Sequence, residues 1–151
     1  MDKGIAIALT AFVGGLVAIQ GPINGRLGQS IGSFPAAAVS FITGTIILVT
    51  LALMFGGGFG KIASQSPPWH YFLGGLLGAA YVTTVLITVK TLGASGIAAA
   101  TVTGQLTTAV VIDRAGAFGL HKTPITPARI LGIALLAAGT YLITTTTHAP
   151  N

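Results

Sequence analysis

Five long, mostly apolar stretches occupy most of the sequence and constrain its fold more than any other feature. They cover residues 4–23, 34–55, 69–89, 93–112 and 127–147. An α-helix rises ~1.5 Å per residue, so about 20 residues cross the ~30 Å hydrocarbon core of a membrane. The sequence therefore predicts an all-α integral membrane bundle of five transmembrane helices in a single domain, residues 1–151. An odd number of crossings puts the termini on opposite sides, as expected for half of a larger assembly that an inverted copy completes.

Composition excludes a water-soluble protein. Only 6% of the residues are charged and 52% are hydrophobic, whereas a soluble domain carries about 25% charged residues. A closed β-barrel is excluded because its strands alternate apolar and polar residues, and these stretches are continuously apolar. The chain has no cysteine, so disulfides and thiolate metal sites are absent. The net charge of +5 comes from basic residues scattered singly, which favours lipid headgroups over nucleic acid as the partner.

The first stretch is predicted to be a retained span and not a cleaved leader. It runs past the ~7–15 residues of a leader's apolar region and has no small-x-small cleavage site before Gln20. With five spans, the basic residues divide five against two between the sides: Lys3, Lys61, Arg114, Lys122 and Arg129 against Arg26 and Lys90. The positive-inside rule then predicts a cytoplasmic N-terminus.

The sequence offers no catalytic centre, and we expect neither an enzyme nor a cofactor. Asp2 and Asp113 are the only carboxylates, which leaves little for general acid–base chemistry. The three histidines do not pair with another ligand type at metal-binding spacing. A phosphate-binding loop of the GxxxxGK[ST] form is also missing.

Polar residues inside the apolar stretches are the candidates for solute binding: Gln20, Asn24, Tyr81 and Gln105. Each must be satisfied without bulk water. Gln20 and Asn24 share a helix face if the helix continues through Pro22, and they either contact a solute or cap backbone groups freed by Pro22. Gln105 either lines a wet cavity or bonds another helix. Tyr81 either holds a solute, including an organic cation on its ring face, or fills the core.

Three further features are candidates for movement or coupling. Gly21 and Pro22 predict a break or kink in the first span, which makes them the hinge candidates. Asp113 is interpreted first as a local ion pair with Arg114 at the membrane surface, and alternatively as a cation or proton site in a vestibule. Arg26 is either an interface anchor or a gate charge.

Four motifs, in order along the chain, resemble the YdcZ-type family of bacterial inner-membrane proteins in the drug/metabolite transporter superfamily. They are Gln20–Gly28, Ser40–Thr45, Gly74–Thr83, and Gly104–Leu106 together with Asp113–Gly116. The resemblance implies a five-helix half of an inverted-repeat, ten-helix transporter, assembled as an antiparallel homodimer or as a heterodimer with a paralogue. Four-helix relatives in the superfamily use a glutamate in the first helix, and this chain has no glutamate. Coupling would therefore fall to Asp113 or to another group.

The sequence thus predicts a secondary transporter subunit that moves a small organic solute or metabolite by alternating access. The solute site would lie near the midplane at the interface between the two halves. The alternative is a non-transporting membrane scaffold or accessory subunit, in which the midplane polar groups only bridge helices. A channel is weaker, because no ring of charges or carbonyls is visible to line a pore.

Overall fold

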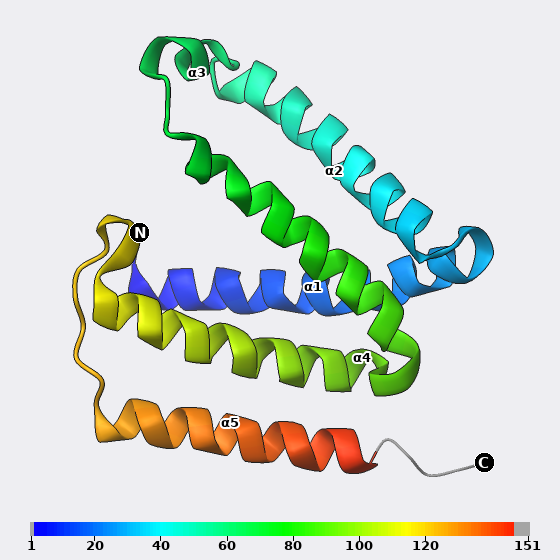
Figure 1. Cartoon of the computed structure of the whole chain (residues 1–151), viewed down its shortest axis with the longest axis vertical. Coiled ribbons are helices and arrows are strands. Elements are labelled where there is room, and N and C mark those ends of the chain that lie inside the picture. Colours follow the sequence, from blue (N-terminus) through cyan, green and yellow to red (C-terminus); the bar gives the residue numbers. More distant parts are fainter. Residues whose placement is uncertain (1, 147–151) are drawn as a thin grey trace. The chain divides into compact units, whose positions relative to one another are not determined.

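The computed structural model describes residues 2–146, and every regular element in that range is helical. The elements are α1 (Lys3–Ile31), α2 (Ser33–Phe55), α3 (Gly60–Gln65), η1 (Trp69–Phe72), α4 (Leu73–Ala115), η2 (Ala117–Gly119) and α5 (Pro127–Thr146), shown in Figure 1. The chain divides into two compact units, residues 1–90 and 91–151. The boundary falls inside α4, so each unit contains one part of that helix. The predicted end of the last span at residue 147 lies outside the described residues.

Four helical stretches in the described chain are long and apolar enough to cross a membrane: Lys3–Ile31, Ser33–Phe55, Trp69–Ala115 and Pro127–Thr145. The all-helical membrane class is therefore confirmed. The third stretch has 47 residues, which at ~1.5 Å per residue is about twice the ~30 Å hydrocarbon thickness. Gly93 interrupts it with φ 66° and ψ 176°, which are not helical angles. The predicted spans 69–89 and 93–112 lie on the two sides of this interruption.

The first helix is longer than the sequence predicted. The sequence predicts a break or kink near Pro22 and ends the first span at residue 23, whereas α1 continues as one helix to Ile31 and contains Pro22 without a break. The residue before a proline is normally disfavoured in a helix because its Cβ clashes with the proline ring. Here that residue is Gly21, which has no Cβ and is buried. Gly32 is the one residue between α1 and α2. Its φ of 91° and ψ of 151° suit glycine.

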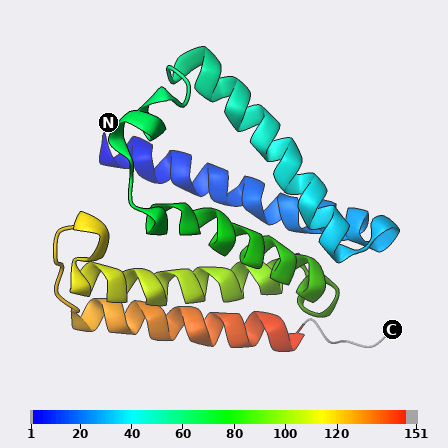
Figure 2. The ribbon, with the colours of Figure 1, turned by 45° about the horizontal axis from the view of Figure 1, so that its top comes forward.

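In the first unit, small residues let three helices approach closely. α1 and α2 meet at the Gly32 turn and diverge from it (Figures 1 and 2). The core there consists of Ala36 and Ala37 from α2 and Leu86 from α4. A Cβ built on Gly25 would lie 2.8 Å from Cγ1 of Val89, so α1 and α4 pack with no room for a side chain at that position. This agrees with close packing through small residues in membrane helices.

In the second unit, α5 packs antiparallel beside the C-terminal part of α4, and the two lie side by side in both views (Figures 1 and 2). Hydroxyl groups join them near the middle. The Oγ1 atoms of Thr103 and Thr140 are 2.7 Å apart, and Thr140 Oγ1 also donates to the carbonyl of Ala99 at 3.0 Å. Threonine pairs of this kind bridge membrane helices at modest energy.

Much of the described surface is apolar, as a lipid-facing protein requires. On α2, Ile46, Leu48 and Met54 remain 62%, 67% and 67% exposed. Between the spans, aromatic residues form η1, where the His70 ring meets those of Trp69 and Tyr71 edge-on. Rings with a polar edge are enriched at the membrane–water boundary. Exposed apolar side chains in this number suit contact with lipid better than contact with water.

Candidate functional site

A small recess in the first unit gathers three of the four predicted solute-binding side chains. Gln20, Asn24 and Tyr81 line it, with Gly21 and the apolar residues Val17, Val82 and Val85. The α1 residues recur at intervals of three and four, so they share one helix face. The α4 residues come from the part of that helix within the first unit. The recess measures about 10 Å³, which is close to the minimum that holds one water molecule.

Asn24 is the most firmly placed of these groups. Its side chain is only 8% exposed, and Nδ2 donates to the hydroxyl oxygen of Ser40 on α2 at 3.1 Å. The other end of the carboxamide forms no hydrogen bond within residues 2–146. Yet no side-chain nitrogen or oxygen in the described part of the chain is both sealed from solvent and unpartnered. The free end of the Asn24 carboxamide is therefore accessible at the recess.

Gln20 and Tyr81 add further unpaired polar groups. Gln20 is exposed, Tyr81 is half-buried, and neither side chain forms a hydrogen bond to a described residue. Neither Gln20 nor Asn24 caps a backbone group freed by Pro22. The recess therefore presents two carboxamides and a phenol hydroxyl, each able to donate and to accept. No charged residue lines it.

Gln105 belongs to the second unit, on the C-terminal part of α4. Its side chain is exposed and forms no hydrogen bond within the described chain. No described residue of the second unit bonds Gln105, and both alternatives for it, a wet cavity and a bond to another helix, stay predictions. Its role in solute binding stays a prediction, as do the hinge role of Gly21 and Pro22 and the gate role of Arg26. Arg26 is exposed and makes no ion pair within residues 2–146.

The expected ion pair between Asp113 and Arg114 is wrong. Asp113 Oδ2 instead lies 3.3 Å from Nη1 of Arg129 at the start of α5, with the two side chains 35% and 34% exposed. Adjacent residues on a helix point about 100° apart and do not face each other, so Arg114 is poorly placed for the pair. The carbonyl of Asp113 also accepts from the backbone N–H of Thr123 at 3.0 Å. Asp113 therefore ties the loop after α4 to the start of α5.

Sequence reasoning missed two polar partners. Ser40 was named only as part of a family motif, although its hydroxyl accepts a hydrogen bond from Asn24 and orients that side chain. Thr103 and Thr140 were not singled out, yet their hydroxyls bridge α4 and α5. Most threonines do bond back to their own helix, and a sequence does not reveal which hydroxyl instead reaches a neighbour.

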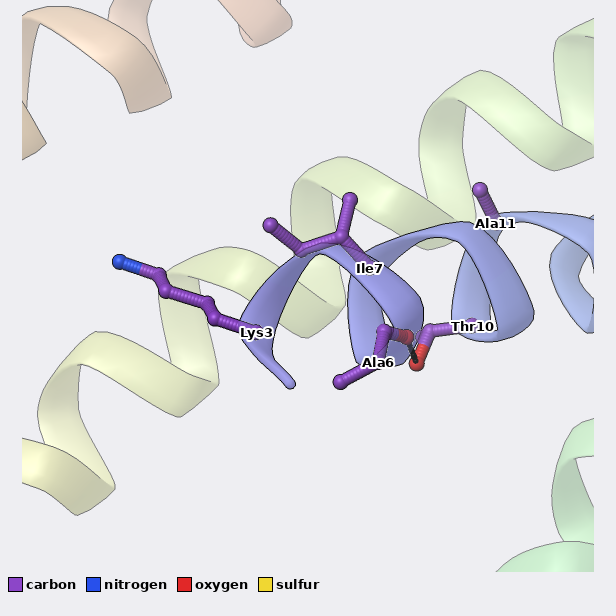
Figure 3. A pocket seen from close by; sticks show the side chains of 5 residues that line it. All are labelled: Lys3, Ala6, Ile7, Thr10 and Ala11. Carbon is purple, nitrogen blue, oxygen red and sulfur yellow. Dashed lines mark hydrogen bonds between the residues drawn. The ribbon is translucent and has the colours of Figure 1, made fainter. Parts of the chain in front are cut away.

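Two larger hollows have a different chemistry. An open groove of about 480 Å³ is lined by Lys3, Ala6, Ile7, Thr10 and Ala11, all from α1 (Figure 3). Its one hydroxyl, on Thr10, already donates to the carbonyl of Ala6 at 2.8 Å. A second groove of about 200 Å³ lies between α2 and α4 and is lined mainly by Phe34, Phe41 and alanines. Both are lined mainly by apolar side chains.

A family comparison decides what kind of membrane protein carries this site. The family model described as "Putative inner membrane exporter, YdcZ" matches residues 5–142. The chain belongs to this family. The resemblance in the four sequence motifs is thereby confirmed, and the chain is an inner-membrane protein of the drug/metabolite transporter type. The YdcZ family is one of transporters and not of enzymes. Searches of curated proteins and of solved structures give no match.

Proposed function

We propose that this YdcZ-family chain is a secondary transporter subunit that moves a small organic solute across the inner membrane by alternating access, as an antiparallel dimer. The observation that carries the proposal is the recess between α1 and α4, where Gln20, Asn24 and Tyr81 meet. Unpaired polar groups on membrane helices are costly. A site that exchanges its hydrogen bonds between water and a solute accounts for their presence.

The size of the recess supports a dimer. Pockets for whole organic ligands have ~300–1,000 Å³, whereas this recess has about 10 Å³. It accommodates one small polar group of a solute, and further walls must enclose the remainder. A second copy or a paralogue in the opposite orientation would supply an equivalent recess across a two-fold axis in the membrane plane.

The interruption at Gly93 supports five crossings. With the long apolar stretch divided there, the chain crosses an odd number of times, and its termini lie on opposite sides. An antiparallel mate then restores the symmetry that alternating access uses. The excess of basic residues on the N-terminal side supports a cytoplasmic N-terminus.

The chemistry of the recess indicates the kind of group that binds. It contains no charge that would select an ion by attraction, while its carboxamides and hydroxyl suit an alcohol, an amide or an amine. The Tyr81 ring can also stabilise an organic cation by about 0.5–2 kcal/mol. In this mechanism Gly21 and Pro22 act as the hinge of α1 and Arg26 as a gate charge. Asp113 serves as a structural ion-pair partner.

The test is a thermal-shift screen of the purified protein with polyols, amino alcohols and primary amines, followed by flux measurements in vesicles. A stabilising solute should lose its effect on Asn24→Ala and on Gln105→Ala while the dimer persists. Thr43→Ala is the matched control, because its hydroxyl only donates to the carbonyl of Val39 in its own helix. A protein that no solute stabilises and that gives no flux would instead be a scaffold or accessory subunit.

Dimer orientation is tested separately by mapping tags at both termini. Mixed orientation of one chain supports a self-paired antiparallel dimer, and a single orientation supports a paralogue as the partner. A lone protomer that transports solute at the full rate would contradict the dimer.

A further inference from the structure

Three polar side chains form a stripe along one face of the C-terminal part of α4: Thr101, Gln105 and Thr108. Their spacing of four and then three residues keeps them within about 60° of one another around a helix with 3.6 residues per turn. Gln105 and Thr108 are exposed and Thr101 is half-buried. The stripe extends ~10 Å along the helix axis, at ~1.5 Å per residue.

None of the three side chains forms a hydrogen bond within residues 2–146. The other threonines of α4 are divided: Thr83 and Thr91 also form no side-chain hydrogen bond within the described residues, whereas Thr84 and Thr88 donate to the carbonyls four residues earlier. Thr107 donates to the carbonyl of Thr103, four residues earlier, at 2.8 Å, and the Thr103 hydroxyl is engaged with that of Thr140. A threonine that faces lipid can satisfy its hydroxyl in this way. Thr101 and Thr108 leave theirs free.

The stripe also faces away from α5. Thr103 is the α4 residue whose hydroxyl meets α5, through Thr140, and on a helical wheel Thr103 lies about 140–160° from the three stripe residues. The bridge between the two helices therefore leaves the stripe uncovered by α5. Val102 and Leu106 lie at intermediate angles and are 47% and 37% exposed. They offer an apolar surface of the same helix for comparison.

We propose that the face made by Thr101, Gln105 and Thr108 lines a water-filled path along which a hydrogen-bonding, uncharged part of the solute moves. Three unpaired polar groups in line would be costly against hydrocarbon, and water satisfies all of them at once. The stripe carries no charge, so its ligand class is hydroxyl, amide or neutral amine. This inference rests on the transporter proposal and adds Thr101 and Thr108 to it.

The test uses the fact that the chain has no cysteine. Thr101→Cys, Gln105→Cys and Thr108→Cys are each exposed to a membrane-impermeant cationic methanethiosulfonate, applied to vesicles of both orientations. Val102→Cys and Leu106→Cys are the controls. The stripe variants should react at least about tenfold faster than the controls, because a thiol must reach water to ionise to the reactive thiolate. Size-exclusion profiles and circular dichroism check that each variant is folded.

Two results would overturn the inference. One is labelling of the stripe variants at the rate of Val102→Cys. The other is oxidative cross-linking of Thr108→Cys between two copies with no labelling, which would assign the stripe to a helix–helix contact. If the stripe variants are labelled but Asn24→Ala leaves every solute-induced thermal shift unchanged, the result supports the water-filled path and contradicts the solute recess. If Asn24→Ala removes the solute-induced thermal shift but the stripe variants are not labelled, the result contradicts only the water-filled path.

Discussion

Close contact between α1 and α4 makes Gly25 the position where a single methyl group tests the packing of the first unit. A Cβ there would lie 2.8 Å from Cγ1 of Val89, which is well inside van der Waals contact. Val89 cannot easily turn away, because a β-branched side chain has one strongly preferred rotamer in a helix. Gly25→Ala therefore forces the two helices apart or strains Val89.

The expected cost follows from two opposing effects. Overpacking of a close contact costs typically ~1–3 kcal/mol, while replacing a helical glycine by alanine gains up to about 1 kcal/mol of helix propensity. Gly14 lies in the same helix with nothing within 4 Å of a built Cβ, so Gly14→Ala should show the gain alone. The difference between the two variants isolates the clash, and we expect Gly25→Ala to be ~1–3 kcal/mol less stable than Gly14→Ala.

The assay is equilibrium unfolding in mixed detergent micelles, followed by circular dichroism. Val89→Ala removes the atom that the new methyl group would meet. The double variant should therefore recover part of the loss, giving a coupling energy outside the ~0.3–0.5 kcal/mol range of independent sites. Equal stability of Gly25→Ala and Gly14→Ala, or additive single and double variants, would refute this contact between α1 and α4.

Three further predictions concern the second unit. Gly93→Ala should destabilise the protein by ~1–3 kcal/mol in the same unfolding assay, because a φ of 66° with a ψ of 176° lies in a region open almost only to glycine; a neutral effect would contradict that backbone. Thr140→Val should cost about 0.6 kcal/mol by loss of an interhelical bond, whereas Thr145→Val, whose hydroxyl donates only within α5, should leave the melting temperature unchanged. Arg129→Ala should lower the free energy of unfolding by less than about 1 kcal/mol, because the side chains of the Asp113–Arg129 ion pair are each about a third exposed. Added salt should reduce the difference in stability between the wild-type protein and the variant. A larger loss of stability that does not depend on salt would contradict this exposed ion pair.

Helix content and part of the recess could be predicted from the sequence because both follow local rules. Continuous apolar runs mark membrane helices whatever their neighbours are. The spacing of Gln20 and Asn24 places both on one face of any helix that contains them. The proximity of Tyr81 could not be derived in this way, since it depends on how α4 packs against α1. It was proposed only because a polar ring within an apolar span needs a reason.

The wrong predictions share one cause: contacts between elements distant in sequence determined the helix at Pro22 and the ion pair of Asp113. Of the break or kink predicted at Gly21 and Pro22, the break does not occur, because a glycine before the proline and close packing keep α1 continuous. Asp113 has a cation beside it in sequence, yet it pairs with Arg129 across the loop. Both outcomes require knowing which element lies opposite, and no window of the sequence contains that information.

The polar groups of the described spans separate into two classes, and this separation carries the functional argument. One class is satisfied inside the protein: most threonines bond to their own helix, and Thr103 bonds across to Thr140. The other class, represented by Gln20, Gln105 and the free end of Asn24, has no partner in residues 2–146. A scaffold would gain nothing from the second class, since apolar residues of similar size would pack without desolvation cost. A transporter needs such groups unpaired, because every hydrogen bond kept within the protein is one that the solute cannot make.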